Sequence, residues 1–213
     1  MTDQLFELAK ADDAAALAAA LKGADLTRIH NEGGESLYRF ALFHGHAKAA
    51  DAIKAKGGLG LHDAALVNDT ARLDALLKAA PWAIDMLSPD GWTALHLAAY
   101  IGADAAVIFL LEHGANARAW ARAFEQNYAI HAAVSGRRIG KAALTKLTAA
   151  TGADAMQKQG YTALMIAAGG NFPLGVEVLL AAGADRSLKL PDGKTAADLA
   201  RERGHAESVK SLE

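Results

Sequence analysis

The stretch DGWTALHLAAYIGADAAVIFLLEHGANAR, which runs from Asp90 to Arg118, is the clearest copy of a pattern that recurs along the chain. Alanine and leucine dominate it, and both favour helix. Glycine at position 102 divides the stretch, so we predict a first helix over Thr93–Tyr100 and a second over Asp104–Glu112, closed by Gly114 in a left-handed cap. A single apolar stripe then crosses both helices, made by Leu95, Val107, Leu110 and Leu111. One pair of helices cannot bury this stripe alone, so neighbouring copies must cover it.

The same pattern recurs along the chain, as ESLYRFALFHGH from Glu35, GLHDAALVN from Gly60, YAIHAAVSG from Tyr128, GYTALMIAAGG from Gly160 and DGKTAADLARERGH from Asp192. One alanine per copy aligns at Ala41, Ala64, Ala98, Ala133, Ala167 and Ala200, with spacings of 23, 34, 35, 34 and 33 residues. A weaker first copy, ELAKADD, places Ala9 a further 32 residues upstream. A small residue at this point predicts a close approach of helices from neighbouring copies. The period therefore predicts a stacked repeat array.

The segments TALHLAAYIG and VIFLLEHGAN resemble the ankyrin repeat, whose Thr-Pro-Leu-His signature recurs about every 33 residues. Alanine follows the threonine here in place of proline. The signature histidine is present as His62, His96 and His131, and is replaced by Arg39, Met165 and Asp198 in other copies. The resemblance implies an all-α solenoid of helix-turn-helix units, joined by short β-hairpins called fingers. Turn signals in SPDGW and LPDGK suit such fingers.

We expect a single array over residues 1–213, with copies near 4–25, 34–57, 59–80, 90–116, 126–154, 160–185 and 192–213, the first and last acting as caps. Two features depart from the regular pattern. The finger between the second and third copies is missing at residues 57–60, because Gly57 lies only two residues before Leu59, the position equivalent to Thr93. In the fifth copy, the sequence GRRIGK lengthens the turn between the two helices.

Composition favours a folded cytoplasmic protein. The chain has 213 residues, of which 52% are hydrophobic and 22% charged, and its net charge is −2. It contains no cysteine, which excludes disulfides, thiolate metal sites and cysteine nucleophiles. The acidic start MTDQLFELAKADD lacks the basic region of a secretory signal, and we predict no membrane span because no apolar run is long enough.

No catalytic residue, metal site or cofactor is predicted. His62, His96 and His131 occupy the signature position, where the resemblance implies a bridge from the helix start to neighbouring backbone. The sequence lacks His-Glu-x-x-His, Gly-x-Ser-x-Gly and phosphate-loop motifs, and its glycines mark repeat turns. We therefore expect a non-enzymatic protein.

The stretch ARAWARAFEQNY, residues 117–128, places Arg118, Trp120, Arg122 and Phe124 on one parity and alanines on the other. In an extended finger these four side chains would share one face. Tryptophan and arginine are frequent interface anchors, so this face is a candidate binding edge. The alternative is that Trp120 only covers a neighbouring finger.

Residues 118–146 are basic, because six cations stand against Glu125: Arg118, Arg122, Arg137, Arg138, Lys141 and Lys146. An ordinary solvated face explains such a group as well as a site does. A second reading is a binder of a small anion at Arg118, Arg122, Arg137 and Arg138. Nucleic acid is not predicted, because the basic segment is short and the isoelectric point is about 6.4.

The resemblance also implies groove positions on the first helices and fingers, which here are Phe43, His44, Leu66, Val67, Trp92, Tyr100, Ile101, Trp120, Ser135, Tyr161 and Lys194. We expect a protein-binding module that uses its concave groove and its fingers, and an acidic partner surface would suit the basic zone. Nothing in the sequence indicates an oligomeric state. The predicted partner-binding residues are Trp92, Tyr100, Ile101, Arg118, Trp120, Arg122, Phe124, Arg137, Arg138 and Tyr161.

Overall fold

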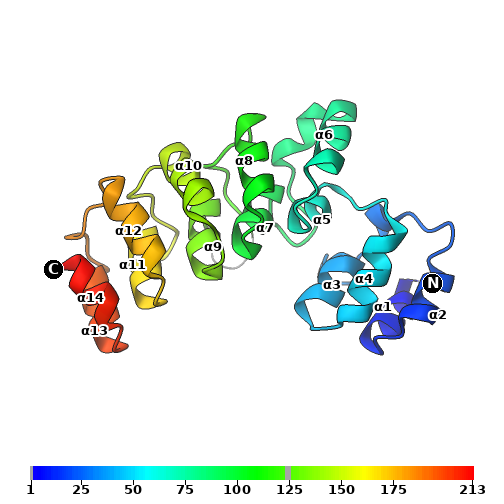
Figure 1. Ribbon diagram of the computed structural model, residues 1–213, viewed down its shortest axis with the longest axis horizontal. Helices are drawn as coiled ribbons and strands as arrows, with labels where there is room; N and C mark the ends of the chain where they lie inside the picture. The colour runs from blue at the N-terminus through cyan, green and yellow to red at the C-terminus, as the bar shows by residue number, and fades with distance from the viewer. Residues whose placement is uncertain (1, 123–125) are drawn as a thin grey trace.

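The computed structural model describes residues 2–122 and 126–213, which contain fourteen α-helices arranged as pairs along an elongated stack (Figure 1). Each pair is a first helix followed by a second. The pairs are α1 (Thr2–Lys10) and α2 (Ala14–Ala20), α3 (Leu37–Phe43) and α4 (Ala47–Lys56), α5 (Leu61–Leu66) and α6 (Thr70–Ala79), α7 (Ala94–Ile101) and α8 (Asp104–Glu112), α9 (Ala129–Gly136) and α10 (Lys141–Thr151), α11 (Ala163–Gly169) and α12 (Pro173–Ala181), and α13 (Ala196–Glu202) and α14 (Ala206–Leu212). Two short 3-10 helices, η1 (Leu26–Arg28) and η2 (Pro81–Asp85), follow α2 and α6.

Side-chain caps fix where the first helices begin. Ser36, Thr93, Thr162 and Thr195 each precede a first helix and accept a hydrogen bond from the backbone N–H three residues later. In the best copy, α7 lies one residue later than predicted, and the predicted bounds of α8 are confirmed. Gly102 caps α7 in the left-handed region, with φ of 80°, where glycine carries no steric penalty.

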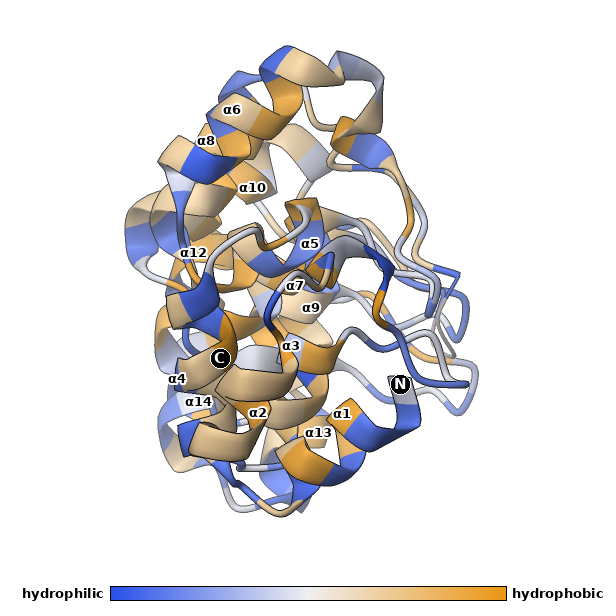
Figure 2. Ribbon diagram, turned by 90° about the vertical axis from the view of Figure 1, so that its right-hand side faces the viewer, coloured by the Kyte–Doolittle hydropathy of each residue, from blue (hydrophilic) through white to orange (hydrophobic). Residues whose placement is uncertain are grey.

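Stacking follows the column of aligned alanines. Ala64, Ala98, Ala133, Ala167 and Ala200 are all fully buried, as the spacing predicted. From α5 onward each first helix packs on the next first helix, and each second helix packs on the next second helix. Figure 2, viewed along the stack, shows α6, α8 and α10 on the outer side of α5, α7 and α9. The chain is therefore an all-α solenoid.

The fingers that the structure describes in full are tight turns rather than β-hairpins. Ser88 N–H donates to the Trp92 carbonyl at 2.7 Å, and Gly91 N–H donates to the Ser88 carbonyl at 2.8 Å. The same pair of bonds closes the segments 31–35, 157–161 and 190–194. Isolated bridges flank two of these turns, and no β-strand is present in the residues described. The hairpin prediction is not confirmed, because pairing does not extend far enough to form a ladder.

The stack is divided where α4 gives way to α5. Helix α4 ends at Lys56, α5 begins at Leu61, and residues 57–60 connect them. Two separate hydrophobic cores lie on either side: one lies within α1–α4, with contributions from Leu59, Leu66 and Leu97, and the other runs from α5 to α14. The division is visible in Figure 1 as the space between α3 and α5. We call this junction the seam.

Polar contacts hold the two sides of the seam together. Arg39, at the signature position of the second copy, is 1% exposed, and its guanidinium lies 3.0 Å from the carboxylate of Asp90. It also donates to the Gly34 carbonyl at 3.1 Å. Gly34 itself lies against Pro89, where a β-carbon would come within 2.6 Å of backbone. The fingers of the second and fourth copies therefore touch directly.

Candidate functional site

A hollow of about 630 Å³ opens on the face formed by the first helices, where α3 meets α7 and α9. We call it the aromatic groove. The predicted residues Trp92 and Tyr100 line it, together with Phe43 and Ser135 from the wider set of groove positions. The remaining lining residues are His96, Leu97, Asn127 and Ala132.

Two exposed rings form the mouth of the aromatic groove. Phe43 ends α3 and is 42% exposed, and Tyr100 lies near the end of α7 and is 45% exposed. Their ring centroids are 6.2 Å apart at an interplanar angle of 86°, an edge-to-face pair. Leu66, at the corresponding position of the intervening copy, is buried, so the two rings meet across the seam.

The third side chain at the groove mouth comes from α9. Ser135 is exposed, and the residue after it, Gly136, lies against the end of α7. A β-carbon at Gly136 would collide with the carbonyl oxygen of Tyr100, so only glycine permits this approach. The glycine thus sets how closely Ser135 and Tyr100 are held.

The floor of the groove is a fully bonded histidine. His96 Nε2 lies 3.0 Å from the carbonyl oxygen of Asn127, which can only accept, so Nε2 carries the proton. Nδ1 then accepts from the Thr93 hydroxyl at 2.7 Å. Burial lowers the pKa of His96 to about 4, so the ring is neutral near pH 7. The Trp92 ring lies beside it, with ring centroids 5.8 Å apart.

The other signature histidines make the same bond. His62 Nε2 lies 2.9 Å from the carbonyl of Met86, and His131 Nε2 lies 3.0 Å from the carbonyl of Ala155. Each bond joins a first helix to the finger that follows its copy. The predicted bridging role of these histidines is confirmed.

The finger between α8 and α9 packs its large side chains on Tyr128. The Trp120 ring lies 4.7 Å from the Tyr128 ring, and the Arg118 guanidinium carbon lies 5.6 Å from the same ring. Trp120 remains 43% exposed, Arg122 is exposed, and Ala117 and Ala121 are buried. Exposure thus alternates over residues 117–122 in the sense predicted, although the described residues of this finger form no strand. Phe124 lies outside the described residues.

Two predicted arginines cap neighbouring helices. Arg118 Nη1 donates to the carbonyl of Thr151, the last residue of α10, at 2.9 Å. Arg137 Nη1 donates to the carbonyl of Gly170, just after α11, at 2.6 Å. Cations at these positions also complement the negative end of each helix dipole. The two guanidiniums are therefore directed to the ends of different helices.

The remaining basic residues are distributed along the surface. Lys141 pairs with Glu177 at 2.6 Å, and Lys146 pairs with Glu112 at 2.5 Å. Arg122 and Arg138 are exposed. With Arg118 and Arg137 bound to carbonyls, these contacts do not bring the cations of residues 118–146 to one point.

The last two predicted residues, Tyr161 and Ile101, do not line the aromatic groove either. Tyr161 is partly buried and lines a neighbouring hollow of about 370 Å³, which shares Ser135 with the groove and also contains Arg137. Ile101 is partly buried and packs against both hydrophobic cores. Its position at the seam makes it a packing residue in this structure.

Sequence reasoning missed one exposed aromatic residue and one buried residue that lines the groove. Trp82 in η2 is 74% exposed, and its signal is the Pro81-Trp82 pair directly after a helical stretch. Asn127 is buried beneath the groove, a position that its place in a finger did not indicate. Neither residue follows from the repeat pattern, because both lie in connecting segments.

The residues that the structure describes include no cluster of three or more side chains able to hold a metal ion. None of the helices that the structure describes is long and apolar enough to cross a membrane.

Comparison with known families matches residues 61–144 to ankyrin repeats, in three copies, and residues 159–189 to a further ankyrin repeat. Together the two matches cover more than half of the chain. No curated protein matches the sequence. The matched segments contain the three signature histidines and most of the aromatic groove, and the chain therefore belongs to the ankyrin-repeat family.

Proposed function

We propose that this chain is a non-enzymatic module that binds a partner protein by taking apolar side chains of that partner into the aromatic groove. Ankyrin repeats are generally protein-interaction modules, which supports the class of function. The single observation that carries the site is the pair of exposed rings, Phe43 and Tyr100, at the mouth of a hollow of about 630 Å³.

The surface chemistry of the groove supports binding of an apolar group. Phe43 and Tyr100 are both more than 40% exposed, so an apolar side chain seated between them would remove ring surface from water. Large aromatic residues in pockets dominate the binding energy of many interfaces. Both rings are held on helices, so binding a partner requires little ordering of the backbone that carries them.

The groove floor supports binding rather than proton transfer. His96 is the titratable residue at the floor, and both of its ring nitrogens are engaged by Thr93 and Asn127. Its lowered pKa keeps it uncharged at neutral pH. A general base needs a free nitrogen within reach of its substrate, and His96 offers none.

The finger between α8 and α9 would form a rim to the same surface. Exposed Arg122 on this finger suits an acidic patch on the partner, and Trp120 adds a half-exposed ring. A contribution from Arg138, in the turn after α9, stays a prediction. Rim charges of this kind mainly accelerate association and select partners. The cytoplasmic location, a scaffolding role and the participation of Arg118, Arg137 and Tyr161 in binding stay predictions.

Affinity capture with three matched baits tests the proposal. The baits are the wild-type chain, Tyr100→Ala at the groove and Trp82→Ala on the exposed ring of η2. We expect a partner that is retained by the wild type and by Trp82→Ala and lost by Tyr100→Ala. Equal capture by all three folded baits would contradict the assignment of the groove.

A further inference from the structure

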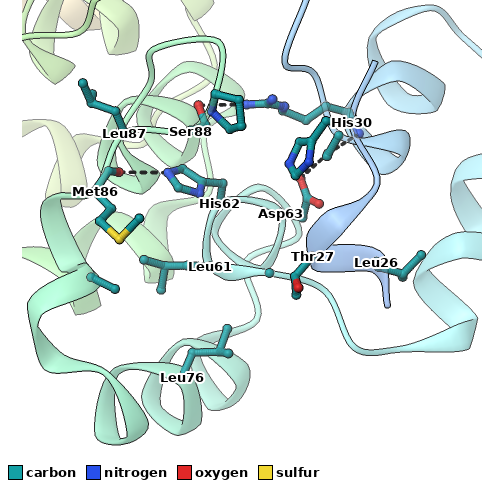
Figure 3. Close-up of a pocket in the computed structure, with 15 residues that line it drawn as sticks. Leu26, Thr27, His30, Leu61, His62, Asp63, Leu76, Met86, Leu87 and Ser88 are labelled. Carbon is teal, nitrogen blue, oxygen red and sulfur yellow. Dashed lines mark hydrogen bonds between the residues drawn. The ribbon is translucent and has the colours of Figure 1, made fainter. Parts of the chain in front are cut away.

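The seam contains a second cavity, of about 360 Å³, separate from the aromatic groove (Figure 3). It lies beneath the contact between Gly34 and Pro89, where the fingers of the second and fourth copies touch. The link 57–60 is too short to place a finger between them. The flanking fingers therefore meet at their tips and leave a space below.

The walls of this cavity are mostly apolar. Leucines come from η1, α5 and α6, and Met86 and Leu87 come from the segment that follows η2; the leucines are Leu26, Leu61 and Leu76. Gly60 supplies a surface without a side chain, against Thr27. In Figure 3, Met86 lies on the wall opposite His30 and Asp63. A hydrocarbon group of a few carbons would lose contact with water on these walls.

One carboxylate lines this apolar space. Asp63 in α5 is 5% exposed, and its Oδ1 accepts a hydrogen bond from the Ser36 hydroxyl at 2.7 Å. No salt bridge to Asp63 is present among the residues described, since the neighbouring cation Arg39 is paired with Asp90. Burial raises the pKa of Asp63 above its usual value. A cationic donor placed in the cavity would offset the burial of this carboxylate.

We propose that the seam cavity binds the ammonium group of an apolar amine, with the Asp63 carboxylate accepting its N–H donors and the leucine and methionine walls holding its hydrocarbon part. The amine is either a small free molecule or the lysine side chain of a peptide. An anion is disfavoured, because Asp63 lines the cavity and the positive charge of Arg39, which also lines it, is paired with Asp90. This site is independent of the aromatic groove and does not rest on the function proposed for it.

The Asp63 carboxylate and the apolar walls together determine which ligands the cavity should prefer. Charge-assisted hydrogen bonds to a carboxylate are about twice as strong as neutral ones, so an amine should bind more tightly than an alcohol of the same shape. The apolar walls should in turn favour a branched hydrocarbon over a polyamine, whose second charge would lie against leucine.

Titration followed by nuclear magnetic resonance tests the proposal on the full chain. The probes are isopentylamine and its neutral counterpart isopentanol. We expect isopentylamine to shift the amide signals of α5 and of residues 86–92 saturably, with a dissociation constant at least about tenfold lower than that of isopentanol. Equal affinities, or shifts elsewhere in the chain, would overturn the assignment.

Three variants locate the interaction. Asp63→Asn should reduce the affinity for isopentylamine to that for isopentanol, whereas Asp74→Asn, on the exposed carboxylate of α6, should leave it unchanged. If Asp63→Asn does not fold, Leu76→Phe provides the test, because it fills the cavity and leaves Asp63 in place. Unaltered binding in Asp63→Asn, or in Leu76→Phe, would contradict the proposal.

A second pair of probes distinguishes the two sources of the amine. N-acetyl-lysine methylamide carries the ammonium on a peptide unit, and N-acetyl-norleucine methylamide lacks it. Binding of the lysine probe with an affinity at least equal to that of isopentylamine supports a peptide lysine, and binding of isopentylamine alone supports a small free amine. Tyr100→Ala should bind both amines as the wild type does, which separates this cavity from the groove.

Discussion

Phe43 and Tyr100, from copies that are not neighbours in the sequence, meet edge to face with their ring centroids 6.2 Å apart. In a regular stack, the residue of the intervening copy would separate them. Here that residue is Leu66, which is buried in the core on the N-terminal side of the seam. The interruption of the array thus places two exposed rings together at the mouth of the aromatic groove.

The seam should be the place where the stack opens most easily. Its core is divided, α5 has only six residues, and Gly57 and Gly58 both have φ in the left-handed region. Native-state hydrogen exchange should show lower protection in α4 and α5 than in α7 and α9, because local opening begins where packing is weakest. Uniform protection across these four helices would count against a weak seam.

Replacing His96 with alanine should destabilise the fold. The change removes the two hydrogen bonds that the imidazole makes in a buried place, to the Asn127 carbonyl and to the Thr93 hydroxyl, which costs about 1 to 3 kcal/mol. Urea unfolding of the variant measures this loss. His113→Ala, on an exposed histidine, is the control and should change the free energy of unfolding by less than about 0.5 kcal/mol. Normal stability of the His96 variant would show that the bridge contributes little.

The free energy of unfolding should fall on mild acidification. The folded-state pKa of His96 is about 4, against an ordinary value of 6.5, because burial disfavours the charged ring. Between these two values the unfolded chain binds a proton at this histidine that the folded chain does not bind. The contribution of His96 to the free energy of unfolding is therefore complete above about pH 6.5 and is lost as the pH falls toward 4. His62 and His131 shift in the same direction.

Asp63 has the opposite effect on how the free energy of unfolding changes with pH. Its folded-state pKa is raised, so its ionisation costs stability once the pH rises above its ordinary value of 3.8. Urea unfolding at pH 7 and pH 5 measures the net effect. Three histidines oppose one carboxylate over this range, so we expect a lower free energy of unfolding at pH 5. Equal or higher stability at pH 5 would contradict the expectation that the histidines outweigh Asp63 over this range.

Reversing the charge of Arg122 should slow association with an acidic partner. The side chain is exposed on the finger between α8 and α9, where rim charges act mainly on the encounter rate. Arg122→Glu should lower the association rate constant and weaken its dependence on salt, while the dissociation rate changes little. Lys22→Glu makes the same change of net charge on the N-terminal cap. If both variants slow association equally, the effect comes from total charge and not from the finger.

The repeat period and the cap residues made the fold predictable. The spacing of the alanines identified residues that are fully buried, and Asp104 and Glu112 bound α8 as expected. These features depend on local sequence, because a helix start needs only a threonine or serine and a left-handed cap needs only a glycine. The length of the fingers was less predictable, since whether a turn extends into paired strands depends on contacts with neighbouring fingers.

The candidate site was predictable only in part. Trp92 and Tyr100 followed from the repeat register and do line the groove. The edge-to-face contact of Tyr100 with Phe43 depends on how two units meet across the seam, which no local pattern encodes. Similarly, Arg118 was expected on an open edge, and the structure shows that its guanidinium caps α10. The sequence contains no signal for this contact of Arg118, because the acceptor is a backbone carbonyl 33 residues away.

The measurement that tests the central claim most directly is the binding free energy of Tyr100→Ala toward a purified partner obtained by capture. Removing a ring from the centre of an interface costs about 2 kcal/mol or more, so the dissociation constant measured by calorimetry should rise at least about thirtyfold. The melting temperature should stay close to that of the wild type, because the ring is 45% exposed. Trp82→Ala serves as the control and should bind normally. Wild-type affinity in a correctly folded Tyr100→Ala variant would contradict the assignment of the aromatic groove as the binding site.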